Sequence, residues 1–158
     1  MPQARNASQT VSLARSAFSY KPVLLHLKSL YYDAHAFKET MVDVPTLAHP
    51  TGSQRFPCAE TVLGVGATHD VVVSVIDGRG KENRFLVVCQ IGAHLPVNRP
   101  LLKLAPDVAW AGSVLIMKMG QRLPFVGMSS MDKADAILAV FKFINACDGP
   151  ELPTFIQA

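Results

Sequence analysis

Four side chains in predicted loops could do nucleophilic or acid–base chemistry if the fold brought them together. Cys58 carries a thiol, and His49, His69 and His94 carry imidazoles that could remove its proton. These residues match no catalytic spacing, because a G-x-S-x-G stretch is absent and no pair of carboxylates stands out. A nucleophile and its base need not be close in sequence, so a small enzyme using this Cys/His set is kept as an alternative function.

The motifs that would hold a metal ion or a dinucleotide are incomplete in this chain. The histidines form neither H-x3-H nor H-E-x-x-H, so no local metal site is supported. Residues 57–60, PCAE, match part of a zinc deaminase signature, but Thr61 stands where its second cysteine belongs. Residues 64–66 lack the third glycine of a dinucleotide loop, and a strand is predicted to follow them instead of a helix. We therefore predict no bound metal and no cofactor.

A second set of candidates is basic and lies around one predicted turn. Arg79, Lys81 and Arg84 could reach phosphates, because a projecting turn approaches a nucleic acid more closely than a flat sheet does. Asp77 and Glu82 carry the opposite charge in the same stretch, and no aromatic residues interleave to stack on bases. We expect weak or absent nucleic-acid binding, and we keep a weak nucleic-acid-binding domain acting through this tip as a further alternative.

The element that carries this turn is the clearest structural signal in the chain. Residues 70–92, DVVVSVIDGRGKENRFLVVCQIG, hold two runs rich in β-branched residues around a polar, glycine-containing turn, which is typical of a β-hairpin. Val71 and Val73 point to one face of the first strand, and Val72 and Ile76 point to the other. Because both faces are apolar, we expect this hairpin to be covered on both sides, by the chain's own helices or by another subunit.

Helices are predicted before and after the hairpin. Apolar residues recur at helical spacing from about residue 21 to residue 38, and an ordinary helix is favoured around residues 10–18. Ser129 or Ser130 can cap a C-terminal helix, which Gly149 and Pro150 then end. The predicted buried stripe of this last helix comprises Ala134, Ile137, Leu138, Phe141 and Ile144. We expect Val87, on a central strand, and Phe141 to be buried in the core.

Short turns between successive strands imply antiparallel pairing, so the predicted fold class is α+β: a single antiparallel sheet of about five or six strands packed by an N-terminal and a C-terminal helix. Residues 1–8 are predicted to be a tail, residues 9–150 a single α+β domain and residues 151–158 a C-terminal tail. The other predicted elements are a strand at 41–44 stopped by Pro45, a loop at 45–58, a strand at 60–65, an irregular segment at 93–112 with a short apolar piece at 101–104, and strands at 113–119 and 122–128.

The cysteines and the N-terminal sequence bear on location. The three cysteines do not form a secreted disulfide framework, and we expect Cys58, Cys89 and Cys147 to be reduced, the last two of them buried. No stretch is long and apolar enough to span a membrane. We predict an intracellular protein, cytoplasmic or nuclear. A mitochondrial location is the alternative, because residues 1–32 are basic and contain no acidic residue.

Composition indicates association with protein. Charged residues are 17% of the chain, below the usual share of about a quarter, so few groups keep the surface of a monomer solvated. The net charge of +3 comes from scattered Lys and Arg residues and not from a basic arm. We predict a non-enzymatic protein-interaction module that self-associates as a homo-oligomer or docks on a protein partner. We expect neither nucleic acid nor a membrane as the partner.

Overall fold

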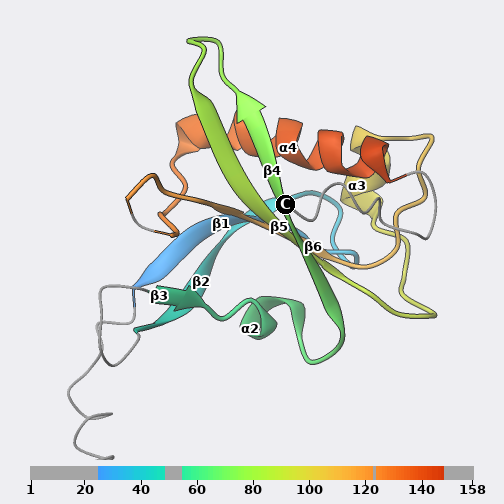
Figure 1. Cartoon of the computed structure of the whole chain (residues 1–158). Helices are drawn as coiled ribbons and strands as arrows, with labels where there is room; N and C mark the ends of the chain where they lie inside the picture. The colour runs from blue at the N-terminus through green and yellow to red at the C-terminus, as the bar shows by residue number, and fades with distance from the viewer. Residues whose placement is uncertain (1–24, 49–54, 123, 148–158) are drawn as a thin grey trace, which may run out of the picture.

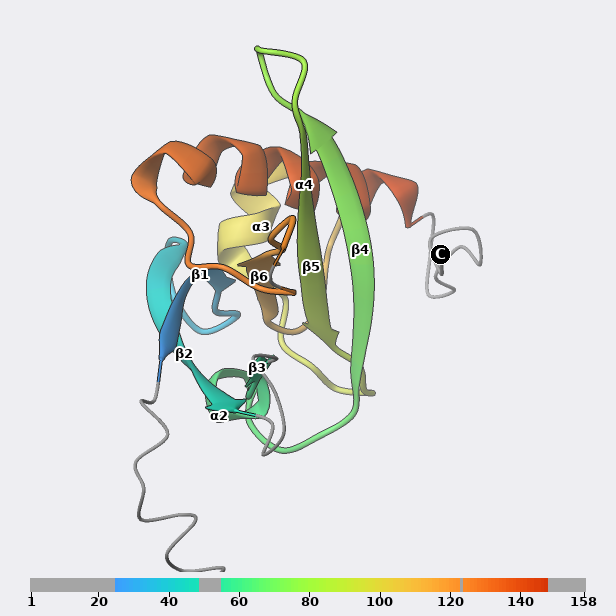
Figure 2. The ribbon, with the colours of Figure 1, turned by 60° about the vertical axis from the view of Figure 1, so that its left-hand side comes forward.

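A computed structural model describes residues 25–48, 55–122 and 124–147. Six strands form an antiparallel sheet in the order β3-β2-β1-β6-β5-β4, and the helices pack on its two faces (Figures 1 and 2). The elements are β1 (His26–Tyr32), β2 (Thr40–Ala48), β3 (Arg55–Pro57), α2 (Glu60–Leu63), β4 (Thr68–Ile76), β5 (Glu82–Gln90), α3 (Arg99–Leu104), β6 (Val114–Lys118), a 3-10 turn at Ser130–Asp132 and α4 (Lys133–Ala146). The α+β class and the single antiparallel sheet are therefore confirmed.

The predicted hairpin is formed by β4 and β5, which pair without interruption from Thr68 opposite Gln90 to Ile76 opposite Glu82. Its tip projects beyond the rest of the molecule (Figure 1). The predicted alternation along β4 is confirmed, because Val71 belongs to the buried core under α4 whereas Ile76 on the other face is 68% exposed. The second face of β4 is thus only partly covered.

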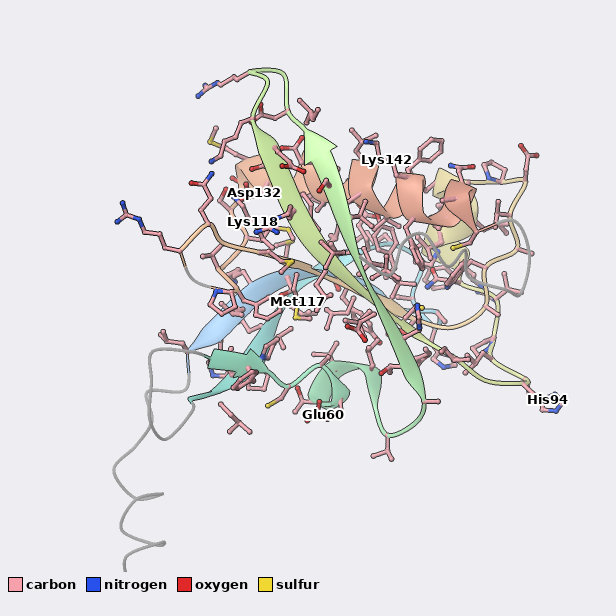
Figure 3. The ribbon with its side chains drawn as sticks, in the orientation of Figure 1. Glu60, His94, Met117, Lys118, Asp132 and Lys142 are labelled. Atoms are coloured by element: carbon pink, nitrogen blue, oxygen red, sulfur yellow. The ribbon has the colours of Figure 1, made fainter. Side chains whose placement is uncertain are left out.

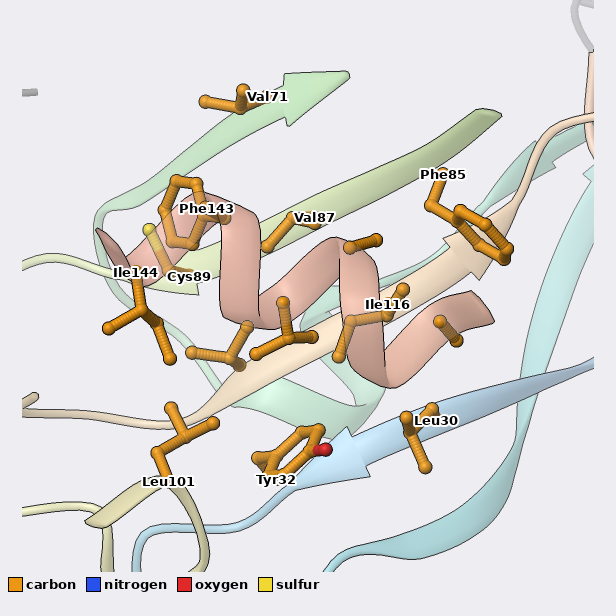
Figure 4. Packing of buried hydrophobic residues seen from close by; sticks show 14 of the residues in the cluster. Leu30, Tyr32, Val71, Phe85, Val87, Cys89, Leu101, Ile116, Phe143 and Ile144 are labelled. Carbon is orange, nitrogen blue, oxygen red and sulfur yellow. The ribbon is translucent and has the colours of Figure 1, made fainter. Parts of the chain in front are cut away.

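Hydrophobic side chains pack on both faces of the sheet. The larger core lies between the sheet and helices α3 and α4, with Val87 fully buried as predicted (Figure 4). The smaller core lies on the opposite face, where Leu63 of α2 packs with Val88 and Leu115. The part of β5 that contains Val87 and Val88 is therefore buried on both faces. The labelled residues of the larger core in Figure 4 are Leu30, Tyr32, Val71, Phe85, Val87, Cys89, Leu101, Ile116, Phe143 and Ile144.

The helix predicted over residues 21–38 is wrong where the structure describes it, since His26–Tyr32 is the strand β1. Leu27 and Leu30 fit a helical spacing, but strand pairing with β2 and β6 decides the conformation. Leu30 lies in the larger core and Tyr31 packs against the smaller one, as the alternating sides of a central strand require. Residues 21–24, and the helix favoured around residues 10–18, lie outside the described residues.

Pro45 does not stop the second strand, because β2 continues to Ala48. The N–H that bonds to β1 belongs to Thr46, which donates to the Leu25 carbonyl at 3.1 Å, and Pro45 needs only to accept a bond from the Cys58 N–H. The predicted loop at 45–58 therefore contains the end of β2 and the whole of β3, and its residues 49–54 lie outside the described chain.

Two further strand predictions are wrong. Residues 60–63 form the short helix α2, and Gly64 ends it with a φ of 82°, which favours glycine. The predicted strand at 122–128 is reduced to an isolated bridge between Lys118 and Val126. The strand at 113–119 is confirmed as β6, and the apolar piece at 101–104 belongs to α3.

The C-terminal helix is confirmed, but its predicted buried stripe is mostly wrong. Leu138 and Phe141 are each 41% exposed, whereas Phe143 is 1% exposed, so Phe141 is not a core residue. Helix α4 is apolar around much of its circumference, and the small side chains of Ala136 and Ala139 let it approach the sheet closely on one side. Of the predicted stripe only Ile144 is buried; Ala134 is exposed and Ile137 is half-buried.

Ser129 begins the helical segment, through a capping box with Asp132 and one 3-10 turn before α4. This confirms one of the two predicted caps. The predicted end at Gly149 and Pro150 lies outside the described residues, and α4 ends at Ala146. Among the described helices, none is both long and apolar enough to cross a membrane.

Candidate functional site

The two edges of the sheet differ in length and composition. The β3 edge is three residues long and ends at Pro57. The β4 edge is nine residues long, contains neither proline nor lysine, and keeps an unbroken register with β5. Proteins usually blunt an exposed edge with lysine, proline, a bulge or a short strand, because its unpaired backbone groups can take up another strand. Proline, lysine and a bulge are absent from β4, and Asp70 is its single acidic residue.

The unpaired groups of β4 can be assigned from its pairing with β5. Asp77 N–H donates to the Lys81 carbonyl at 2.9 Å, and Ile91 N–H donates to the Ala67 carbonyl at 2.9 Å. In an antiparallel pair every second residue faces the neighbouring strand, so the odd-numbered residues of β4 bond to β5. The N–H and C=O groups that face outward belong to Thr68, Asp70, Val72, Ser74 and Ile76.

One side chain reaches this edge in the part of the chain that the structure describes. Lys142 Nζ of α4 lies 3.4 Å from the carbonyl oxygen of Ser74. This is a long contact between exposed groups, and such a contact contributes little. The ammonium of Lys142 therefore contacts a single carbonyl of the edge, and no other side chain of the described residues bonds to the outward groups.

The side chains around the edge are partly apolar. Val72 is half-buried and Ile76 is largely exposed on the sheet face opposite α4, with Ser74 exposed between them. Helix α4 presents Leu138 and Phe141 to the solvent. Apolar groups are therefore exposed both along the β4 edge and on the outer side of α4.

The Cys58 thiol is half-buried between β3 and α2. The backbone N–H of Cys58 donates to the Pro45 carbonyl at 2.8 Å, and the Cys58 carbonyl accepts bonds from the N–H and the hydroxyl of Thr61. Burial, followed by the negative charge of Glu60, raises the pKa of the Cys58 thiol. The thiolate is the nucleophilic form, so this environment makes Cys58 a poorer nucleophile than a free cysteine.

The candidate histidines are dispersed. His69 lies within β4, where its carbonyl accepts a bond from the Cys89 thiol at 3.5 Å. His94 is exposed in the loop after β5 with a φ of 69°, and Figure 3 shows it at the lower right, away from Glu60 of α2 at the bottom centre. His49 lies outside the described residues. The structure therefore does not bring His94 to Cys58.

The described residues contain no group of three or more His, Cys, Asp or Glu side chains arranged to hold a metal ion.

The carboxylate of Asp77 binds the backbone of the turn that carries Arg79 and Lys81. Asp77 Oδ1 accepts the N–H groups of Arg79 and Lys81, each at 2.9 Å, and these two bonds, that of Lys81 first, lower the pKa of Asp77. Asn83 links the turn to α4, because its amide nitrogen lies 3.5 Å from Asp77 Oδ2 and 3.2 Å from Asp135 Oδ2. The tip thus sets the negative charge of Asp77 close to Lys81, and such a mixed surface attracts phosphates weakly.

Arg84 is separate from the other two basic candidates. It lies within β5 opposite Ser74, and its carbonyl accepts a bond from Met119 N–H at 2.9 Å. Arg79 and Lys81 lie at the exposed turn.

The sequence reasoning missed the outward residues Val72 and Ser74 as candidates. The available signal is the Val-rich run of β4, which predicts a strand covered on both sides, whereas Ser74 and Ile76 are exposed. Comparison of the chain with protein-family models, with curated proteins and with solved structures finds no significant match.

Proposed function

We propose that this chain is a non-enzymatic protein-interaction module that binds protein through the free edge of β4. The observation that carries the proposal is the nine-residue edge, which has no proline, lysine or bulge and has the backbone groups of five residues facing outward. An added strand would satisfy these groups with main-chain hydrogen bonds, which is a common way for proteins to recognise an extended segment.

The low share of charged residues supports the same function. Charged residues make up 17% of the chain, and the exposed side chains Ile76, Leu138 and Phe141 lie on the hairpin and on α4. An edge that binds nothing exposes a protein to uncontrolled pairing, so natural sequences that keep a long, open edge usually have a use for it.

The two alternatives have weaker support. An enzyme using Cys58 would need an activated thiol, and burial and Glu60 act in the opposite direction. A nucleic-acid-binding domain would need an uncompensated basic surface, and Asp77 binds the backbone of the turn that carries Arg79 and Lys81.

The proposal can be tested by placing a photoreactive amino acid at Val72, on the edge, and at Thr61, an exposed residue of α2 that serves as the control. Illumination of the full chain, alone and in cell extract, should give protein adducts from position 72 and not from position 61. Excess wild-type chain should compete for these adducts, and excess V72K chain should not, because a lysine on the edge opposes strand addition. Equal yields from both positions, or no adduct from position 72, would overturn the proposal.

A further inference from the structure

We propose that the occupant of the β4 edge is β4 of a second copy of this chain, paired antiparallel about a two-fold axis at Val72. This inference rests on the proposed function and specifies its partner. Two six-stranded sheets would join into one continuous sheet, with α4 of both copies on the same face.

The position of the outward groups favours this register. Val72 is the central residue of the strand Thr68–Ile76, and the five outward residues are placed symmetrically around it. A two-fold axis at Val72 sets Val72 opposite its own copy, Asp70 opposite Ser74 of the second copy, and Thr68 opposite Ile76 of the second copy. Each outward N–H then meets an outward C=O, as in an ordinary antiparallel ladder. An axis at any other residue leaves outward groups beyond the end of the partner strand.

The side chains are also compatible with their own copies in this register. On the α4 face, Val71 lies opposite Val73 of the second copy, and β-branched pairs stabilise neighbouring strands. On the other face, the hydroxyl of Ser74 can donate to the Asp70 carboxylate of the second copy. An axis at Asp70 would instead oppose two carboxylates, which is destabilising.

A second copy also explains why one edge is open and the other is not. Pairing of β4 with its own copy uses the same surface twice and makes the two β3 strands the outer strands of the joined sheet. Those edges are three residues long and end at Pro57, so the assembly closes as a dimer and does not grow. The Lys142 ammonium leaves the Ser74 carbonyl in this dimer, because that carbonyl accepts the N–H of Asp70 of the second copy.

Two measurements on the full chain test the proposal. Sedimentation equilibrium at micromolar concentration should give about twice the 17.1 kDa of one chain. In a Cys58→Ser background, which removes the half-buried native thiol, Val72→Cys should form an intermolecular disulfide under mild oxidation. The expected Cα separation of such a pair, about 5.5 Å, lies within the range that a disulfide spans.

Matched variants test the pairing register of the two β4 strands and identify the surface that forms the dimer. Ser74→Cys alone should not cross-link to itself, whereas an equimolar mixture of Ser74→Cys and Asp70→Cys chains should. Val72→Lys should weaken dimerisation at least ~100-fold, because two like charges then face each other. Leu138→Lys, which adds the same charge on the outer side of α4, should leave the dimer intact. Circular dichroism and thermal unfolding of each lysine variant show whether the protomer still folds.

The outcomes separate this inference from the function beneath it. A folded wild-type monomer whose photoreactive Val72 variant labels a different protein would overturn the second copy as partner and leave the interaction module standing. Absence of any adduct at position 72 would overturn both. Self-cross-linking of Ser74→Cys or Asp70→Cys would overturn the register. Loss of the dimer in Leu138→Lys would show that the dimer interface lies on α4 instead of on the β4 edge.

Discussion

Lys118 Nζ of β6 lies 2.6 Å from Asp132 Oδ1, immediately before α4 (Figure 3). The same carboxylate accepts the N–H and the hydroxyl of Ser129 at 2.8 and 2.9 Å. Strand β6 lies at the centre of the sheet, so this mostly buried pair attaches the beginning of α4 to a central strand.

Asp132→Ala should therefore destabilise the protein by about 2 kcal/mol at pH 7, through the loss of the cap and of a charge-assisted bond. Burial opposes ionisation of Asp132, but the bonds from Lys118 and Ser129 outweigh it and lower its pKa below 3.8. The contribution is therefore present above pH 3.8 and is lost as the pH falls through the lower pKa of the folded state. Urea unfolding at pH 7 and pH 3 measures both effects.

The exposed ion pair between Lys28 and Asp43 provides the control for this experiment. Its two atoms lie 3.5 Å apart and both side chains are more than half exposed. Asp43→Ala should cost less than about 0.5 kcal/mol, because water screens such pairs. Equal losses in the two variants would contradict the role given to Asp132.

Two phenylalanines on α4 should respond differently to truncation. Phe143 is 1% exposed and packs edge-on against Trp110, with ring centroids 5.2 Å apart, whereas Phe141 is 41% exposed. Phe143→Ala should cost about 3–5 kcal/mol, because it leaves a cavity between α4 and the sheet. Phe141→Ala should cost less than about 1 kcal/mol. If thermal unfolding showed a larger loss of stability for Phe141→Ala than for Phe143→Ala, Phe141 would be the core residue.

The same pair of residues shows what the sequence could predict about the fold. The existence and beginning of α4 follow from local signals, namely Ser129, Asp132 and the apolar run after them. The local sequence does not indicate which side of α4 is buried, because the helix carries apolar residues on both sides. The choice between them is made by Ala136 and Ala139, whose small side chains allow close contact with the sheet.

The prediction of a helix over residues 21–38 is wrong at β1 for a related reason. A short apolar run fits both the helical and the strand period, so Leu27 and Leu30 could not discriminate between them. The discriminating contacts are distant in sequence, as in the pairing of Leu30 with Ile116. The hairpin, by contrast, is local and was predictable from its β-branched runs and its turn.

The β4 edge could not be predicted, because it depends on strand order. Strand β5 pairs with β6 on its other side, and no other strand of the described residues pairs with β4, so β4 has β5 as its single neighbour. No residue within 68–76 signals that arrangement. The sequence places the Cys/His candidates in or beside loops but does not indicate their relative positions, and the fold sets His94 away from Glu60 of α2 (Figure 3).

Asn98 should be among the most sensitive polar residues of the described chain. It is fully buried, and its amide nitrogen donates to the carbonyls of Tyr32 and Gly112 at 2.9 Å each while its oxygen caps α3 at Leu101 N–H. Asn98→Ala should cost about 3 kcal/mol, because two buried carbonyls and one N–H lose their partner.

Asn98→Asp separates these two roles. The carboxylate can still cap α3, but it cannot donate to Tyr32 and Gly112, and it places a charge beside their carbonyl oxygens. We expect at least as large a loss at pH 7 as for alanine, with partial recovery at low pH when the carboxyl is protonated. If urea unfolding found the Asn98→Asp protein as stable as the wild type, the two donated bonds would be unimportant.

Cys89 should make stability depend on pH in the alkaline range. Burial, followed by the proximity of Cys147, raises the pKa of the Cys89 thiol from 9.0 to about 11. The folded state keeps the proton at a pH where the unfolded chain has lost it, so the free energy of unfolding should fall as the pH rises from 9 towards 11. Cys89→Ala should lose stability overall and should flatten this decline in urea unfolding between about pH 8 and pH 10.5.

Cys58 tests the enzymatic alternative directly. Because burial and Glu60 raise its pKa, iodoacetamide at pH 8 should alkylate Cys58 more slowly than free cysteine, although it is the most exposed of the three thiols. Glu60→Gln removes the nearby negative charge and should speed the reaction about twofold. Thr61→Ala, which removes the hydroxyl bonded to the Cys58 carbonyl and leaves Glu60 in place, is the control and should change the rate little. Alkylation faster than that of free cysteine, slowed by a change at His69, would show an activated thiol and would favour the small enzyme over the interaction module.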